Sequence, residues 1–141
     1  MARAKNAQNG ILSQHWGPPL WKFLHIMACN YDPKRKINKK YSKDIYRDFF
    51  QNVLGEILPC RKCRINYKET FRKTIEKMEE GRGKRYSVYK DRESMTEFVY
   101  ILHNTVNEEV RAQQAEIGIK KRKKKIPSLE KVRLLCDTQR A

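Results

Sequence analysis

Apolar side chains recur along the chain with the period of amphipathic helices, and this pattern divides it into several helical segments. The first runs from about Leu20 to Tyr31, directly after the prolines of "GPP", which we expect to mark the helix start. The second covers residues 42–58. The third begins at Pro59 or Cys60 and ends where two glycines interrupt "EEGRGKR".

A fourth segment begins near Asp91 or Ser94, both suitable helix caps, and continues to Val110. A short amphipathic segment, "SLEKVRLLC", follows Pro127. Neither strand-like alternation of useful length nor an internal repeat is evident in the sequence. The pattern therefore predicts an all-α fold, a four-helix bundle with a short additional C-terminal helix. We expect residues 1–14 to form a flexible polar tail and residues 15–141 to form one domain.

Composition adds a strong positive charge to this picture. The chain has 141 residues, of which 39% are hydrophobic and 34% charged, and its formal net charge is +16. Such a charge attracts polyanions, so a basic helical nucleic-acid-binding protein is one candidate. We interpret the run Lys120 to Lys125 by default as a solvated face, with a phosphate contact or a nucleic-acid or nuclear-import patch as the alternatives. The sequence contains neither a signal-peptide core nor a stretch apolar enough to span a membrane, so we expect no membrane association.

The first candidate for a reactive or metal-binding site is the motif "LPCRKCRINY", which contains Cys60 and Cys63. A Cys-x-x-Cys pair is half of a tetrahedral zinc site, but the remaining candidate ligands are His25, Cys29, His103 and Cys136, which form no second pair of suitable spacing. We therefore predict no metal site, although structural or zinc-binding cysteines remain the alternative that accompanies nucleic-acid binding.

A redox role fits the cysteine pair better than inert burial. Three cations, Arg61, Lys62 and Arg64, surround the two thiols. The predicted helix start also presents free N–H groups and the positive end of the helix dipole, which favour the thiolate. A thioredoxin-like fold would require strands on both sides of the motif, and the helical periodicity argues against that fold.

Three separated patches together resemble the Erv/ALR family of FAD-dependent sulfhydryl oxidases, most closely its compact viral members. "WGPPLWKFLHIMACNY" is similar to the family's W-G-x-x-x-W-x-x-x-H helix followed by a tyrosine, "LPCRKC" to its P-C-x-x-C, and "HNTVN" to its H-N-x-V-N. Their order and spacing agree with the family over roughly residues 15 to 110.

The resemblance implies a helical bundle that binds FAD, usually as a homodimer. Motif matching assigns the flavin and adenine sites to Trp16, Gly17, Trp21, His25 and Tyr31 from the first helix, and to His103, Asn104, Val106 and Asn107 from the fourth. It further implies that thiol-containing protein substrates are oxidised to disulfides, with electrons passing through Cys60 and Cys63 to FAD and then to O₂, which becomes H₂O₂. In that scheme Cys63 lies next to the flavin and Cys60 meets the incoming thiol.

The sequence departs from the family pattern in several places. Phe98 stands where a tryptophan is usual, and Asp32 is inserted after the motif tyrosine. Ile101 replaces a cysteine of the second structural disulfide of cellular members, so the C-terminal segment must be held in another way. In the family, a lysine that contacts the FAD phosphates follows the H-N-x-V-N motif closely. Here about a dozen extra residues come before "KKKIPS", so the resemblance implies Lys124 or Lys125 as the counterpart of that lysine.

Two cysteines remain outside the motif. We interpret Cys29 as a buried thiol on the inner face of the first helix, and Cys136 as an inert thiol near a flexible terminus or as the site of an intermolecular or mixed disulfide. The expected location is the cytoplasm, either host cytoplasm or virion if the chain is viral, rather than the mitochondrial intermembrane space.

Overall fold

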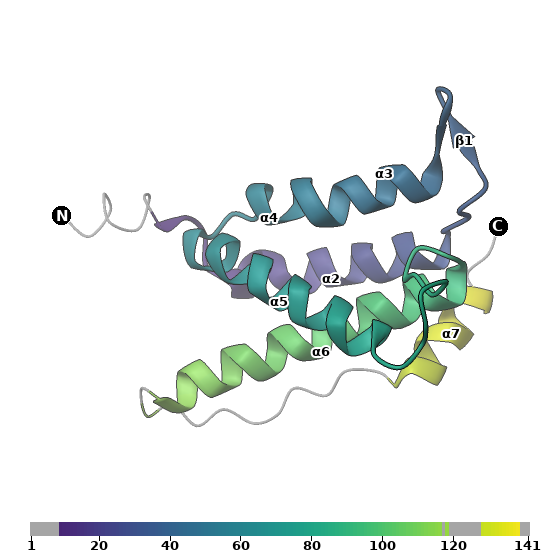
Figure 1. The fold of residues 1–141 in the computed structure, drawn as a ribbon. Coiled ribbons are helices and arrows are strands. Elements are labelled where there is room, and N and C mark those ends of the chain that lie inside the picture. The colour runs from purple at the N-terminus through teal and green to yellow at the C-terminus, as the bar shows by residue number, and fades with distance from the viewer. Residues whose placement is uncertain (1–8, 117, 119–127, 139–141) are drawn as a thin grey trace.

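The computed structural model describes residues 9–116, 118 and 128–138. Within them the chain forms helices α2 (Ser13–Cys29), α3 (Ser42–Asp48), α4 (Leu54–Ile57), α5 (Arg61–Glu79), α6 (Arg92–Glu116) and α7 (Leu129–Thr138). A π-helical turn, η1 (Phe49–Val53), joins α3 to α4, and two short strands, β1 (Lys36–Ile37) and β2 (Lys40–Tyr41), precede α3 (Figure 1). The predicted all-α fold is confirmed.

Helix α2 begins at Ser13, so the predicted start near Leu20 is wrong. Pro18 and Pro19 lie inside the helix and not at its first position. Both lack an N–H group, which leaves the carbonyls of Gln14 and His15 without their usual helical donors. Because those two residues are exposed, water can bond to the carbonyls, and the helix tolerates the prolines in its second turn.

The expected second helix is not a regular α-helix throughout. Its middle is the π-helical turn η1, and Leu58 leaves the helical conformation just before Pro59. A residue that precedes proline is pushed towards extended backbone, which ends α4 there. On α5 the Tyr67 hydroxyl donates to the Phe50 carbonyl in this π-helical turn at 2.6 Å, so the irregular turn is fixed to the next helix.

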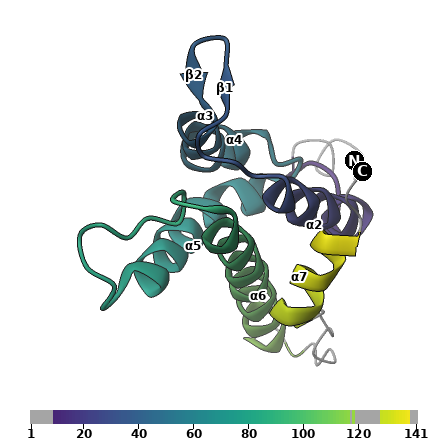
Figure 2. The same cartoon turned by 90° about the vertical axis from the view of Figure 1, so that its right-hand side faces the viewer.

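A two-residue antiparallel hairpin, which the periodicity did not predict, lies in the charged loop before α3. Lys36 pairs with Tyr41 and Ile37 with Lys40, while the turn residues Asn38 and Lys39 have positive φ angles of 50° and 69°. Two consecutive residues of positive φ match the turn type that suits a tight hairpin. Figure 2 shows this hairpin extending away from the helices, at the start of α3.

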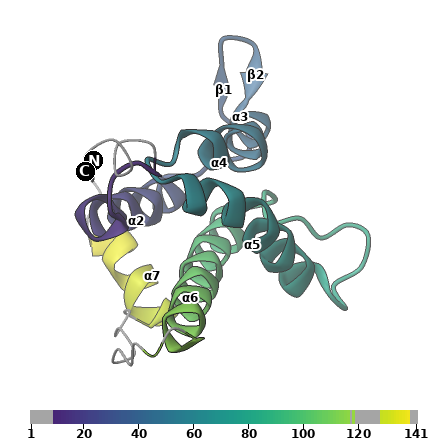
Figure 3. The same cartoon turned by 90° about the vertical axis from the view of Figure 1, so that its left-hand side faces the viewer.

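The core lies where the helices cross, and α2 and α5 both pack against α6. Phe98 of α6 is completely buried and contacts Phe50 and Phe71 edge-on, with ring centroids 5.1 and 6.0 Å apart. Helix α7 packs against both α2 and α6, as Figure 3 shows. In the part of the chain that the structure describes, no helix is long and apolar enough to cross a membrane.

Candidate active site

The cysteine pair lies at the start of α5. Cys60 is the N-cap residue, and its Sγ accepts a hydrogen bond from the backbone N–H of Cys63 at 3.2 Å. The two cysteines form a disulfide with a Cα–Cα distance of 5.1 Å. This confirms the predicted placement in the first helical turn, where free N–H groups stabilise negative charge on sulfur.

The three cations around the pair have different environments. Arg61 and Lys62 are exposed, whereas the guanidinium of Arg64 donates to the Leu58 carbonyl at 2.8 Å. Arg64 therefore holds the short connection between α4 and α5 in addition to contributing charge. All three add positive potential beside the sulfur atoms, which favours thiolates when the disulfide is reduced.

A second cluster, formed by Trp21 and His25 of α2 and His103 of α6, joins residues far apart in sequence. The rings of Trp21 and His103 stack with centroids 4.2 Å apart and an interplanar angle of 10°. His25 Nε2 and His103 Nδ1 are 3.0 Å apart and share a hydrogen bond. Two motifs separated by 78 positions therefore meet in space, as the resemblance implied.

Burial gives His25 a distinctive chemistry. Removal from water lowers the pKa of its imidazole below the ordinary value of 6.5, so the ring is neutral at pH 7. Its Nδ1 atom is buried and has no hydrogen-bond partner among the described residues. A buried polar atom without a partner is rare in proteins and often marks a place where a ligand belongs.

These arrangements agree with a comparison of sequences. A sequence model of the Erv1 / Alr family matches residues 18–127, which include the cysteine pair and both histidines. The chain belongs to the Erv1 / Alr family. It is also 31% identical over 94 residues to a probable FAD-linked sulfhydryl oxidase of Acanthamoeba polyphaga mimivirus, an alignment that covers 67% of this chain and 57% of that relative.

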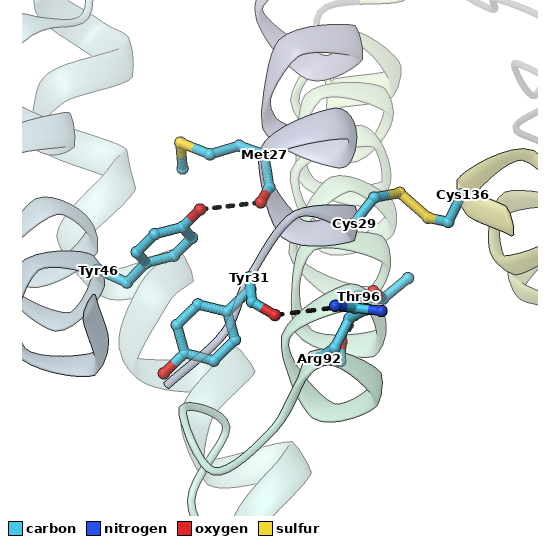
Figure 4. Close-up of a disulfide and its surroundings, with 7 residues drawn as sticks. All are labelled: Met27, Cys29, Tyr31, Tyr46, Arg92, Thr96 and Cys136. Atoms are coloured by element: carbon cyan, nitrogen blue, oxygen red, sulfur yellow. Dashed lines mark hydrogen bonds between the residues drawn. A yellow bond between two sulfur atoms is a disulfide. The ribbon is translucent and has the colours of Figure 1, made fainter. Parts of the chain in front are cut away.

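The other first-helix residues of this Erv1 / Alr member have unequal surroundings. Trp16 is half-buried, and its Nε1 donates to the Ile11 carbonyl at 2.8 Å. Gly17 is buried, yet a Cβ placed there would have open space around it. Tyr31 is 1% exposed, its hydroxyl donates to the Tyr89 carbonyl, and its ring contacts Tyr46, so it belongs to the core at the far end of α2 (Figure 4). Its predicted contact with a cofactor stays a prediction.

On α6, Asn104, Val106 and Asn107 are all half-buried. Asn107 lies one turn after His103, which places both on one face of the helix. Lys124 and Lys125, the predicted phosphate contacts, lie outside the described residues, as does the rest of the run Lys120 to Lys125. Among the residues described, no group of three or more His, Cys, Asp or Glu side chains is arranged to hold a metal ion.

The interpretation of Cys29 and Cys136 as separate thiols is wrong. They form an intramolecular disulfide that joins α2 to α7, with a Cα–Cα distance of 5.3 Å (Figure 4). Sequence reasoning missed it because 107 positions separate the two cysteines, and only the packing of α7 against α2 brings them together. Together with its packing against α2 and α6, this bond holds the C-terminal helix in the absence of a cysteine at position 101.

A cleft of about 820 Å³ between α5 and α6 lies apart from the predicted site. Carboxylates dominate its lining and outnumber the cations, and it contains none of the predicted cofactor residues. The lining residues are Lys73, Glu76, Lys77, Glu79, Glu80, Thr105, Glu108 and Glu109. Because a pyrophosphate carries the same sign of charge as these glutamates, the cleft is unsuited to a dinucleotide.

Proposed function

We propose that this chain is an FAD-linked sulfhydryl oxidase that introduces disulfides into thiol-containing protein substrates. The observation that carries the proposal is the Cys60–Cys63 disulfide at the start of α5, in which Cys60 Sγ also accepts a hydrogen bond from the Cys63 N–H. Two substrate thiols lose two electrons and two protons as they form a disulfide. O₂ accepts the two electrons and the two protons and becomes H₂O₂. Family membership and the mimivirus relative support this assignment.

The sulfur chemistry follows from where each cysteine lies on the helix. A substrate thiolate attacks Cys60 Sγ and forms a mixed disulfide, while Cys63 leaves as a thiolate. The second substrate thiolate then attacks the substrate sulfur of the mixed disulfide, which releases the oxidised substrate and the Cys60 thiolate. The positive end of α5 and the adjacent cations stabilise both leaving thiolates.

The residues of α2 and α6 that meet in the candidate site fit the FAD that the family resemblance implies. Trp21 and His103 offer stacked aromatic faces, and the buried Nδ1 of His25 lacks a hydrogen-bond partner among the described residues. Asn104 and Asn107 add amide groups able to bond to hydroxyls or ring edges. When bound, FAD would accept the two electrons of the dithiol and pass them to O₂.

The absorption spectrum of the purified protein tests the proposal at once. A flavin band in the visible region, together with dithiothreitol-dependent O₂ consumption, is the expected result. A nucleic-acid-binding protein without FAD would be colourless, and such a result would contradict the proposed function.

Cys63→Ser tests the electron path. We expect the variant to keep its bound FAD and yellow colour while losing dithiothreitol-dependent O₂ consumption, because a hydroxyl group in place of the Cys63 thiol cannot form the disulfide. The Cys136→Ser variant, which retains Cys60 and Cys63, serves as the control and should keep the oxidase activity. Full activity in Cys63→Ser would rule out the path.

We further propose a homodimer and a cytoplasmic location, in host cytoplasm or virion if the chain is viral. Support for the dimer comes from α2, where Phe23 and Ile26 are 58% and 57% exposed and lie on one face of the helix. Large apolar side chains grouped on a helix face favour association with a second surface. Fractionation of cells that produce the protein would test the location.

A further inference from the structure

A short segment before α2, Gly10 to Leu12, lies directly against the cysteine motif; we call it the N-terminal strap. The Ile11 N–H donates to the Pro59 carbonyl at 2.6 Å, and Gly10 forms an isolated antiparallel bridge with Cys60. The strap thus pairs with the backbone of Pro59 and of Cys60, and the Cys60 thiol is the one expected to meet the substrate. None of the family motifs includes it.

The strap also contacts the predicted flavin site. The Ile11 carbonyl accepts a hydrogen bond from Trp16 Nε1 at 2.8 Å, and the His15 N–H donates to the Leu12 carbonyl at 3.0 Å as the chain enters α2. The N–H and the carbonyl of one residue, Ile11, therefore link Pro59 to Trp16. Ile11 connects the first-helix side of the site with the redox cysteines.

The strap holds the short connection between α4 and α5 by its backbone. Leu58, Pro59 and Cys60 separate α4 from α5, and Pro59 has no N–H with which to bond. Arg64 holds the Leu58 carbonyl at 2.8 Å, and Ile11 holds the next carbonyl, that of Pro59. Together the two contacts fix the backbone immediately before Cys60.

Glycine is required at position 10 by both space and backbone conformation. Its φ is +90°, and a Cβ there would lie 2.4 Å from the Pro59 oxygen and 3.1 Å from the Cys60 Cα. Both are backbone atoms that cannot rotate away. Gly81 has a comparable φ of +73° but nothing within 4 Å of its Cβ position, so it shares the conformation without the contact.

We propose that Gly10 and Ile11 are positioning residues of the redox centre, which hold Cys60 in register with Trp16 and the flavin. This inference rests on the proposed function. Electron delivery from a dithiol is sensitive to placement, since displacement by about 1 Å can lower a rate by about a hundredfold. Any side chain at position 10 displaces the strap and frees the Pro59–Cys60 backbone.

The test compares Gly10→Ala with Gly81→Ala, which introduces similar backbone strain at a site distant from the cysteines. The rate of anaerobic flavin reduction by dithiothreitol should fall about tenfold or more in Gly10→Ala and stay near the wild-type rate in Gly81→Ala. FAD content should match in the two variants. Amide hydrogen exchange at Ile11 should accelerate only in Gly10→Ala.

A second pair of variants isolates the hydrogen bond. Ile11→Pro removes the N–H that bonds to Pro59, whereas Ile11→Ala keeps it and removes only an exposed side chain. We expect slower flavin reduction in Ile11→Pro alone. Equal reduction rates in Gly10→Ala and Gly81→Ala, or an unprotected Ile11 amide in the wild type, would overturn the inference. A colourless wild-type protein would instead contradict the proposed function, while the exchange measurement would still decide whether the strap is held.

Discussion

His25 shows how one residue acquires a special property from its surroundings. Trp21 stands one turn before it on α2, and the His103 ring of α6 stacks on that tryptophan and bonds to His25. The i, i+4 spacing predicted that Trp21 and His25 share a face. It could not predict the third ring, because contact with α6 depends on tertiary packing, and only the family resemblance implied it.

Stability should therefore depend on pH through His25. In the unfolded chain this residue titrates near 6.5, and burial lowers its pKa in the folded protein. As the pH falls from 7 through 6.5 towards the lowered value, the unfolded state binds a proton that the folded state does not, so the free energy of unfolding decreases. Below the folded-state pKa the loss levels off.

Urea unfolding between about pH 7.5 and pH 5.5 would measure this dependence. We expect His25→Asn to show a smaller decrease over that range than the wild type. His15 is exposed, so His15→Asn is the matched control and should keep the wild-type profile. An unchanged profile in His25→Asn would show that other groups cause the dependence.

At the scale of elements, the helices and several of their ends follow from periodicity and capping, but α6 continues to Glu116, past the predicted end at Val110. Asp91 accepts a hydrogen bond from the Ser94 N–H at 2.8 Å, as expected of a cap, and Cys60 caps α5. The early start of α2 was not predictable from "GPP", because helix tolerance for proline depends on whether the freed carbonyls reach water. The π-helical turn η1 could not be predicted either, because its Phe50 carbonyl accepts a hydrogen bond from the Tyr67 hydroxyl of α5, a tertiary contact that periodicity does not reveal.

The disulfide between Cys29 and Cys136 should stabilise the protein through α7. An isolated ten-residue helix is marginal in water, and this one is fixed covalently to the end of α2. Removing a disulfide that closes so long a loop typically lowers the free energy of unfolding by about 2–5 kcal/mol. We expect a loss in that range for Cys136→Ser, measured by urea unfolding under non-reducing conditions.

Because both cysteines belong to one bond, the effect should not be additive. The double variant Cys29→Ser/Cys136→Ser should be about as unstable as either single variant. Non-reducing electrophoresis should show a monomer band in every variant, since the bond is intramolecular. A crosslinked dimer that disappears in Cys136→Ser would contradict the assignment.

For the whole molecule, the sequence predicted the all-α bundle because its apolar stripes are long and regular, and it predicted the cysteine pair because its motif is local. It missed the Cys29–Cys136 bond and the N-terminal strap, which both join segments remote in sequence without any spacing signal. The net charge of +16 is visible in the composition, yet it does not identify a partner. The charge should act on the association of two copies of the chain, because like charges repel one another.

Formation of the proposed dimer through α2 should respond to salt in the opposite way to nucleic-acid binding. Two copies that each carry a charge of +16 repel one another, and salt screens that repulsion, so higher salt should strengthen the dimer. Binding to nucleic acid weakens with salt because counterions are released. Light scattering coupled to gel filtration at increasing salt would measure the mass directly.

Phe23→Asp tests whether the exposed face of α2 forms the interface. A two-fold interface contains each residue twice, and burying a phenylalanine side chain contributes about 1.5–3 kcal/mol. Replacing it with aspartate should therefore raise the dimer dissociation constant by at least about a hundredfold and give a monomer at all salt concentrations. Ile37 is 41% exposed on the hairpin, away from α2, so Ile37→Asp is the control and should leave the mass unchanged. A dimer that persists in Phe23→Asp and dissociates in Ile37→Asp would place the interface on the hairpin side of the molecule.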